Sequence, residues 1–253
     1  MPYSIAIGGP PGTGKSWFAS SIADIVGAEH TLALCAKPRE AASYGYTSRG
    51  IKTELFTDLG WRPSLKMFET GGFMAFMRRL WDLMSDDQYD AVLVDPFTDV
   101  AELVAHELLK KDNASTARET NDTMGFYGEL RPKLIEVTRC ITQLQFAARP
   151  KHVIVTVHMQ PIKEEAPAKK GEVAKKAQDK KAQGWMFEGG ALPAFEGSAK
   201  YLWASEFDAF LLSDVVTRFD SKLKPPRSVT EYVIQVRPDN ERHATIAFLP
   251  ALA

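Results

Sequence analysis

The sequence predicts an α/β protein with a doubly wound, mainly parallel sheet and a C-terminal antiparallel hairpin. Short runs that are apolar on both faces alternate with helical stretches, which is typical of a parallel sheet covered by helices on both sides. A glycine-rich segment joins the first strand to the first helix at residues 9–16, and residues 228–250 predict two strands around the turn "PDNE". With 253 residues the chain is long enough for one domain over 1–253 with a sizeable core.

The first half of the chain supplies two strands and two helices. "YSIAIGG" (3–9) and "TLALCA" (31–36) are short apolar runs and predict buried strands. Between them "SWFASSIADIVG" (16–27) has helical periodicity and ends at a glycine. Residues 39–61 are mixed and punctuated by glycines, and residues 71–86 again carry apolar side chains at helical spacing.

The second half continues the alternation. The near-continuous apolar run "YDAVLVDPF" (89–97) predicts a strand that ends in an aspartate, and a helix is predicted at 101–111. The next helix is expected at 132–148, with Pro132 suited to its first turn. Further strands are predicted at 152–158 and 207–213.

Two polar stretches interrupt this pattern, at 111–129 and 162–184. The second has no aromatic residue and carries seven lysines against four acidic residues. A segment of this composition cannot bury enough apolar surface to offset the entropy of ordering, so we expect a mobile loop inside the domain.

Composition excludes several classes of protein. Hydrophobic residues make up 45% of the chain and the net charge is −1, so no overall field draws it to nucleic acid or to a membrane. Cys35 and Cys140 form no CxxC pair or disulfide framework. Because no run approaches 18 apolar residues and no leader pattern is visible, we expect a cytoplasmic protein with no membrane partner (host cytoplasm, if phage-encoded).

The segment "GPPGTGKS" matches the phosphate-loop pattern G-x-x-x-x-G-K-[ST] and lies between a predicted strand and helix, where phosphate binding needs it. Its glycines let successive backbone N–H groups face phosphate oxygens, Lys15 would reach the β- and γ-phosphates, and Ser16 would ligate Mg²⁺. The pattern predicts ATP and Mg²⁺ as ligands, since guanine motifs such as N-K-x-D are absent. The candidate nucleotide contacts are Gly9, Pro10, Pro11, Gly12, Thr13, Gly14, Lys15, Ser16 and Trp17.

A second magnesium-site residue is expected at the end of another apolar strand. "AVLVD" ends at Asp95, whose carboxylate would hold Mg²⁺ through water. A helix-capping aspartate is the alternative, but Thr98 and Asp99 fit that role better.

Hydrolysis also needs a base and a group that senses the γ-phosphate. Glu40 follows the second strand in "CAKPRE" and is our candidate base, with Glu69 as the next choice and a surface salt bridge as the alternative for both. His158 directly follows the strand "VIVTV", and ligands bind at the carboxyl ends of parallel strands. We therefore predict that His158 contacts the γ-phosphate and relays its loss to the lysine-rich segment that follows; the alternative is a strand-end histidine with only a structural role.

From residue 3 to about 215, the order of these motifs resembles that of the RecA-like recombination ATPases, especially the short single-domain forms carried by phages. The resemblance implies a P-loop NTPase fold of RecA-like type, with 111–129 and 162–184 lining a path for single-stranded DNA. It also implies a homo-oligomer in which a neighbouring subunit supplies a cation to the site. The candidates for that cation are Arg218, Lys222, Lys224, Arg227 and Arg237.

The sequence leaves three functions open. A DNA-dependent ATPase of recombination, repair or replication is favoured by alternating lysines and small residues in 162–184, which suit contact with a phosphate backbone. An assembly or motor ATPase acting on a protein partner is favoured by the near-neutral charge and by the acids within that segment. A small-molecule P-loop kinase is the third, although the chain shows no arginine-rich lid.

Overall fold

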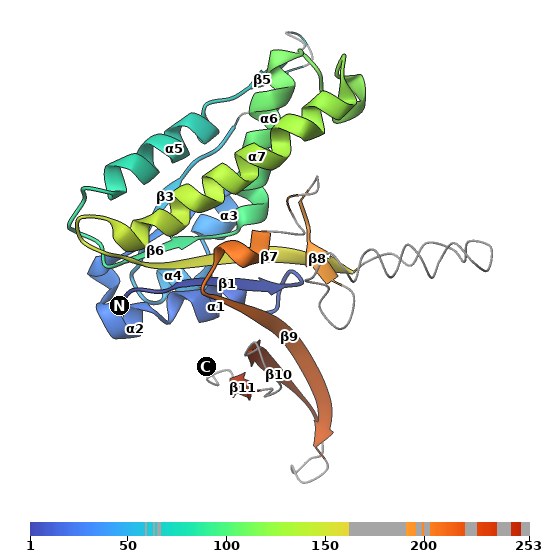
Figure 1. Cartoon of the computed structure of the whole chain (residues 1–253). Helices are drawn as coiled ribbons and strands as arrows, with labels where there is room; N and C mark the ends of the chain where they lie inside the picture. The colour runs from blue at the N-terminus through green and yellow to red at the C-terminus, as the bar shows by residue number, and fades with distance from the viewer. Residues whose placement is uncertain are drawn as a thin grey trace.

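The structure is a computed structural model that describes residues 1–58, 60–62, 64, 67–161, 191–195, 199, 203–220, 227–236 and 244–248. Its centre is a twisted sheet with the strand order β11-β10-β9-β1-β7-β6-β2-β3 (Figure 1). These strands are β1 (Ser4–Gly9), β2 (Thr31–Cys35), β3 (Lys52–Leu55), β6 (Ala91–Val94), β7 (His152–Pro161), β9 (Ala209–Asp220), β10 (Arg227–Val236) and β11 (Ala244–Phe248). A short strand, β8 (Ala191–Pro193), pairs with the end of β7.

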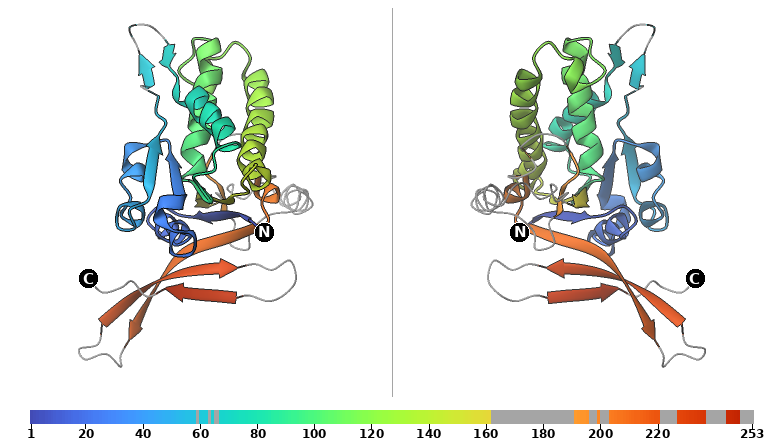
Figure 2. Two further views of the ribbon diagram at one scale, coloured as in Figure 1. Left: turned by 90° about the vertical axis from the view of Figure 1, so that its left-hand side faces the viewer. Right: turned by 90° about the vertical axis from the view of Figure 1, so that its right-hand side faces the viewer.

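The strands from β9 to β3 are parallel to one another, as the buried apolar runs predict. The C-terminal hairpin is also confirmed, because β10 and β11 pair antiparallel; its "PDNE" turn lies outside the described residues. β10 pairs antiparallel with β9 as well, so the two hairpin strands extend the main sheet beyond the helical layers (Figure 2). The predicted α/β fold with a mainly parallel sheet of P-loop NTPase type is therefore confirmed.

Helices cover both faces of the parallel part (Figure 1). α5 (Gly72–Leu83), α6 (Phe97–Lys111) and α7 (Thr123–Thr142) lie on one face. Their apolar side chains pack with alternate strand residues such as Leu34 and Val94. The opposite face packs against α1 (Lys15–Ser20), α2 (Ala23–Val26) and α4 (Tyr44–Thr47) through residues such as Ala33 and Leu93. Successive residues of a strand therefore pack alternately into the cores on the two faces of the sheet, which explains the continuous apolar runs.

Shorter elements complete the description. They are the helix α3 (Pro38–Ala41), the 3₁₀ turns η1 (Ala28–His30), η2 (Ala117–Glu119), η3 (Gln143–Phe146) and η5 (Trp203–Glu206), and the ribbon of β4 (Gly60–Arg62) and β5 (Met67–Glu69). The ribbon forms a separate two-stranded sheet that lies beyond the start of α5 and beside the end of α6 (Figure 2).

The structure corrects two predicted boundaries. The helix expected at 132–148 begins at Thr123, where the Asp122 side chain accepts a hydrogen bond from the backbone N–H of Gly125, and Pro132 lies inside it. The polar stretch 111–129 is consequently shorter as a loop, because its last part is helical. Asp122, inside the stretch predicted as a loop, is the N-cap of this helix.

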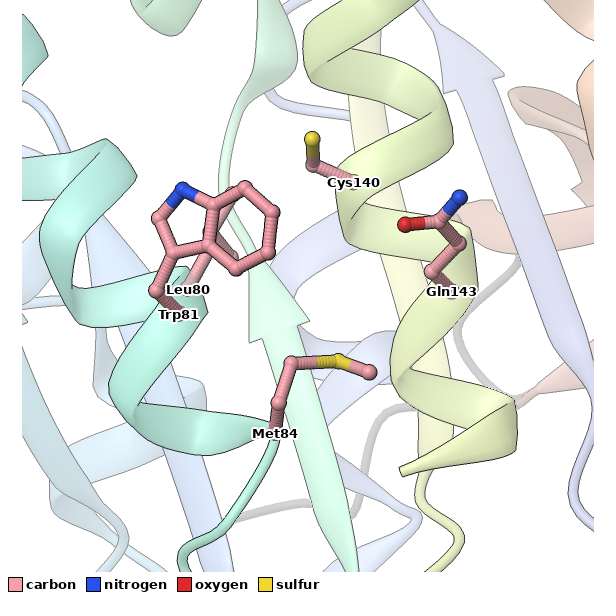
Figure 3. A pocket seen from close by; sticks show the side chains of 5 residues that line it. All are labelled: Leu80, Trp81, Met84, Cys140 and Gln143. Atoms are coloured by element: carbon pink, nitrogen blue, oxygen red, sulfur yellow. The ribbon is translucent and has the colours of Figure 1, made fainter. Parts of the chain in front are cut away.

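The small cavity between α5 and α7 cannot be a substrate site. It is lined by Leu80, Trp81, Met84, Cys140 and Gln143 and encloses only about 10 Å³ (Figure 3), room for about one water molecule at most. No helix among the described residues has the length and apolarity to cross a bilayer.

Candidate functional site

Three strand ends meet at one edge of the sheet. β7 lies between β1 and β6, and all three run in the same direction, so their carboxyl ends lie side by side (Figure 1). In this register His158 is paired with Gly9, the first glycine of the phosphate loop. An open pocket of about 930 Å³ lies at this edge. It is lined by the phosphate loop and by Lys37, Arg39, Glu40, Tyr44, Asp95, Thr98, Asp99, Glu102 and His158, among others.

The phosphate loop has the conformation that an anion site requires. Gly14 precedes α1 with φ of 78°, a left-handed conformation that is costly for other residues. Thr13 donates a hydrogen bond from Oγ1 to the Pro10 carbonyl at 2.9 Å and so closes the loop on itself. Lys15 Nζ donates to the carbonyl oxygens of Gly9 and Pro10, at 3.0 and 2.7 Å. The lysine is thus held inside the loop, beside the position where phosphates would bind.

Burial has an electrostatic consequence for Lys15, which is 5% exposed. Desolvation lowers the pKa of its ammonium group to about 8, although Asp95 and Glu40 oppose the shift. Among the described residues no ion pair joins Lys15 to a carboxylate, and its polar contacts are carbonyls. A phosphate group would supply the charge partner that the side chain lacks.

Asp95 is buried at the end of β6, with 2% exposure. Both carboxylate oxygens accept hydrogen bonds: Oδ2 from the Tyr46 hydroxyl and Oδ1 from the Thr156 hydroxyl. Burial and the nearby Asp95 raise the pKa of Tyr46 well above its usual value, so the phenol remains a donor. These donors come from two separate elements, α4 and β7, and each bonds to a different oxygen of the carboxylate.

Glu40 is brought to the pocket by α3, the short helix that follows β2. Burial, followed by the charges of Asp95 and Asp99, raises the pKa of its carboxyl group, which makes it a better proton acceptor than an exposed glutamate. The alternative base, Glu69, ends β5 in the separate ribbon. The geometry therefore favours Glu40.

His158 lines the pocket at the end of β7. Its backbone N–H donates to Thr98 Oγ1 at 2.9 Å, while its buried Nδ1 has no hydrogen-bond partner in the part of the chain that the structure describes. Burial and the positive charge of Lys15 lower the pKa of the imidazole, which keeps it neutral at pH 7. A neutral imidazole in the wall of the pocket is suited to a polar ligand.

The mouth of the pocket carries an aromatic pair. Trp17 and Tyr44 stack with ring centroids 5.6 Å apart and planes at 7°, and the Arg49 guanidinium lies 4.1 Å from the centre of the indole. Trp17 is 41% exposed and Tyr44 73% exposed. Because Tyr44 and Arg49 both lie on the faces of Trp17, the more exposed ring of Tyr44 is the one available to a ligand that enters the pocket.

Whether the site fits Mg²⁺ depends on the donor atoms of Ser16 and Asp95. Both line the pocket, and hydroxyl and carboxylate oxygens are the donors that Mg²⁺ prefers. The described residues contain no group of three or more His, Cys, Asp or Glu that could hold a metal. Mg²⁺ usually takes only one or two protein ligands and completes its shell with phosphates and water, so Ser16 and Asp95 fit as its donors.

Sequence reasoning missed three contributors to the site: Tyr44, Tyr46 and Thr156. The first two lie in the mixed stretch 39–61, for which we predicted no helix. Thr156 points from the middle of an apolar strand and interrupts its run with one hydroxyl, which was the available signal.

Several predicted elements cannot be compared with the structure. The lysine-rich stretch 162–184 lies outside the described residues, as do Lys222, Lys224 and Arg237. Arg218 lies in β9 and Arg227 begins β10, without described side chains. In the stretch 111–129, Lys111 is paired with Glu129 at 2.9 Å.

Comparison with known proteins identifies the family. The profile of a family described as an AAA domain matches residues 1–186, most of the chain. The chain therefore belongs to this AAA-domain family and is a P-loop ATPase that binds a nucleotide. Comparison with curated protein sequences gave no match.

Two solved structures are similar to the chain at low identity. One is a KaiC-like protein from the hyperthermophilic archaeon Pyrococcus horikoshii OT3, with 13% identity and a TM-score of 0.41 over 97% of this chain and 83% of that chain. The other is the flagellar accessory protein FlaH from Methanocaldococcus jannaschii, with 13% identity and a TM-score of 0.39 over 98% and 86%. Similarities this weak add nothing to the assignment of function.

The pKa of Lys15 makes nucleotide affinity dependent on pH. A bound phosphate favours the charged ammonium, so above pH 8 binding must take up a proton, whereas below pH 8 the proton is already present. The dissociation constant of ATP, measured by calorimetry in EDTA from pH 7 to 9.5, should rise above pH 8 by up to about tenfold per pH unit. In Lys15→Arg, which stays charged, this component should vanish; a flat profile in the wild type would contradict the assignment.

Proposed function

We propose that the chain is a Mg²⁺-dependent ATPase that couples ATP hydrolysis to the binding of single-stranded DNA in recombination, repair or replication. One observation carries the coupling: His158 lines the phosphate pocket in register with Gly9 and lies four positions before the lysine-rich stretch that begins at 162. The same strand thus connects the nucleotide to the segment with the composition of a DNA contact.

The residues at the pocket have separate roles in the proposed hydrolysis of ATP. The phosphate loop, with its N–H groups and Lys15, binds the β- and γ-phosphates and orients them. Ser16 and Asp95 would hold Mg²⁺, which neutralises phosphate charge when bound. Glu40 accepts a proton from the attacking water, a role that its raised pKa favours.

His158 serves as the sensor in this proposal. Its imidazole lines the phosphate pocket, where a γ-phosphate oxygen or its water would be a hydrogen-bond partner, and its backbone is tied to Thr98 on α6. Loss of the γ-phosphate would remove that hydrogen-bond partner from the imidazole, which is unfavourable, so the end of β7 would respond. β7 continues to Pro161, directly before the lysine-rich stretch.

The charge of 162–184 supports a nucleic acid as the partner. Seven lysines outnumber four acids there, and lysine contacts with phosphates are independent of base sequence. By contrast 111–129, the other segment that the RecA-like resemblance assigns to the DNA path, carries four acids against Lys111 and Arg118. The proposal therefore depends on 162–184, and a protein partner for this segment is the alternative outcome.

Replacing the candidate base separates binding from hydrolysis. Glu40→Gln should reduce kcat for ATP by about 10²–10⁴-fold, because a positioned base contributes that much, while ATP still binds. The matched control is Glu129→Gln, on α7 and paired with Lys111 outside the pocket, which should keep its activity. Retained turnover in Glu40→Gln would reject Glu40 as the base; calorimetry and a phosphate-release assay give the two quantities.

The DNA partner is tested by measuring ATP turnover with and without an unstructured single-stranded oligonucleotide at several salt concentrations. Single-stranded DNA should raise turnover, with an effect that declines as salt rises. Changing the seven lysines of 162–184 to glutamine should abolish the stimulation and leave basal turnover unchanged. Neutralising instead Glu164, Glu165, Glu172 and Asp179 should strengthen DNA binding.

Three results of that experiment would contradict a DNA partner. These are wild-type turnover and DNA retention that are unaffected by DNA at low salt, stimulation that survives in the lysine variant, and weaker DNA binding in the variant without acids. Association with a protein that depends on ATP and on the lysines, without any DNA effect, would establish the alternative.

We also propose a homo-oligomer in which a cation of a neighbouring subunit completes the ATP site, as the RecA-like resemblance implies. Sedimentation velocity with a non-hydrolysable ATP analogue and Mg²⁺ should then show a larger species than without nucleotide. A monomer under both conditions would reject this part of the proposal.

A further inference from the structure

The short helix α4 connects three parts of the nucleotide site. Its first residue, Tyr44, stacks on Trp17 at the mouth of the pocket. Its second, Gly45, lies so close to α1 that an added Cβ would be 3.0 Å from the Ser16 carbonyl oxygen and the Trp17 Cα. Its third, Tyr46, is fully buried and reaches Asp95. Three consecutive residues thus contact the aromatic mouth, the start of the phosphate-loop helix and the magnesium carboxylate.

The Tyr46 hydroxyl is one of two donors that fix the Asp95 carboxylate. The other is Thr156, also fully buried, and each donor engages a different oxygen. A carboxylate bonded at only one oxygen can rotate about its Cβ–Cγ bond, whereas two donors on opposite sides fix the plane of the group. Each oxygen still has a lone pair for the water shell of a cation.

This arrangement also keeps two opposite charges apart. Lys15 and Asp95 interact electrostatically, yet Lys15 bonds to loop carbonyls and Asp95 to two hydroxyls. A free carboxylate in this buried pocket would be attracted to the ammonium group, and a direct ion pair would occupy both groups.

We propose that Tyr46 is a positioning residue for magnesium: with Thr156 it holds the Asp95 carboxylate towards the metal position and away from Lys15. This inference rests on the part of the proposed function that assigns a MgATP site to Asp95, and it is independent of any DNA partner. Tyr46 thus belongs to the same short helix, α4, that packs on α1 and stacks on Trp17 at the mouth of the pocket.

The test is the difference between nucleotide binding with and without metal. The dissociation constant of ADP is measured by calorimetry in Mg²⁺ and again in EDTA, and the ratio of the two gives the metal contribution. In Tyr46→Phe this contribution should fall, and the Mg²⁺ concentration for half-maximal ATP turnover should rise by roughly 10–100-fold, as for other residues that orient metal ligands. ADP affinity in EDTA should stay near that of the wild type.

The matched control is Tyr89→Phe. Tyr89 is also fully buried, but it precedes β6, whereas Asp95 follows that strand. Its hydroxyl accepts a hydrogen bond from Lys52. Its removal should leave the Mg²⁺ dependence unchanged. A Tyr46→Phe variant with a lowered melting temperature and a wild-type metal contribution would show a packing role only and overturn the inference.

Thr156 provides a second test if Tyr46→Phe does not fold. Thr156→Ser retains a hydroxyl and should retain the metal contribution, whereas Thr156→Val should lose it. Equal contributions in these two variants would overturn the inference. If the wild type itself binds ADP equally with and without Mg²⁺, both this inference and the proposed metal site fail; a normal Mg²⁺ effect that Tyr46→Phe leaves intact rejects the inference alone.

Discussion

The parallel register of β1, β7 and β6 is the constraint on which the site depends. Gly9 lies opposite His158, and Val94, the residue before Asp95, lies opposite Val155. Since these strands are buried on both faces, a shift of one residue would move every side chain into the wrong core. The cores on the two faces therefore fix the strands lengthwise, and this brings the phosphate loop, Asp95 and His158 to one edge.

Asp95 is both a buried residue and part of the lining of the candidate nucleotide pocket. Burying a carboxylate is unfavourable unless it is hydrogen-bonded, and leaving one such bond unmade costs about 1–3 kcal/mol. Tyr46 and Thr156 supply both bonds with neutral hydroxyl donors. Lys15 is stabilised in a similar way by two carbonyls. In both cases the hydrogen-bond partners found among the described residues are neutral groups.

The order of sheet and helices could be predicted from the sequence because apolar runs and helical periodicity are local patterns. The phosphate loop and Asp95 could be predicted because their motif combines residue type with position after a strand. The start of α7 could not, since Pro132 suggested a first turn while the Asp122 cap lay ten positions earlier. Tyr46 and Thr156 could not either, because their relation to Asp95 exists only once α4, β6 and β7 have packed together.

The most direct test of the account is a structure of the protein with Mg²⁺ and a non-hydrolysable ATP analogue. The account predicts phosphates bound along Gly12 to Ser16, Mg²⁺ on the side of Ser16 and Asp95, and Glu40 and His158 facing the γ-phosphate. Phosphates bound elsewhere in the pocket, or Asp95 turned away from the metal, would contradict the claim that these three strand ends form one ATP site.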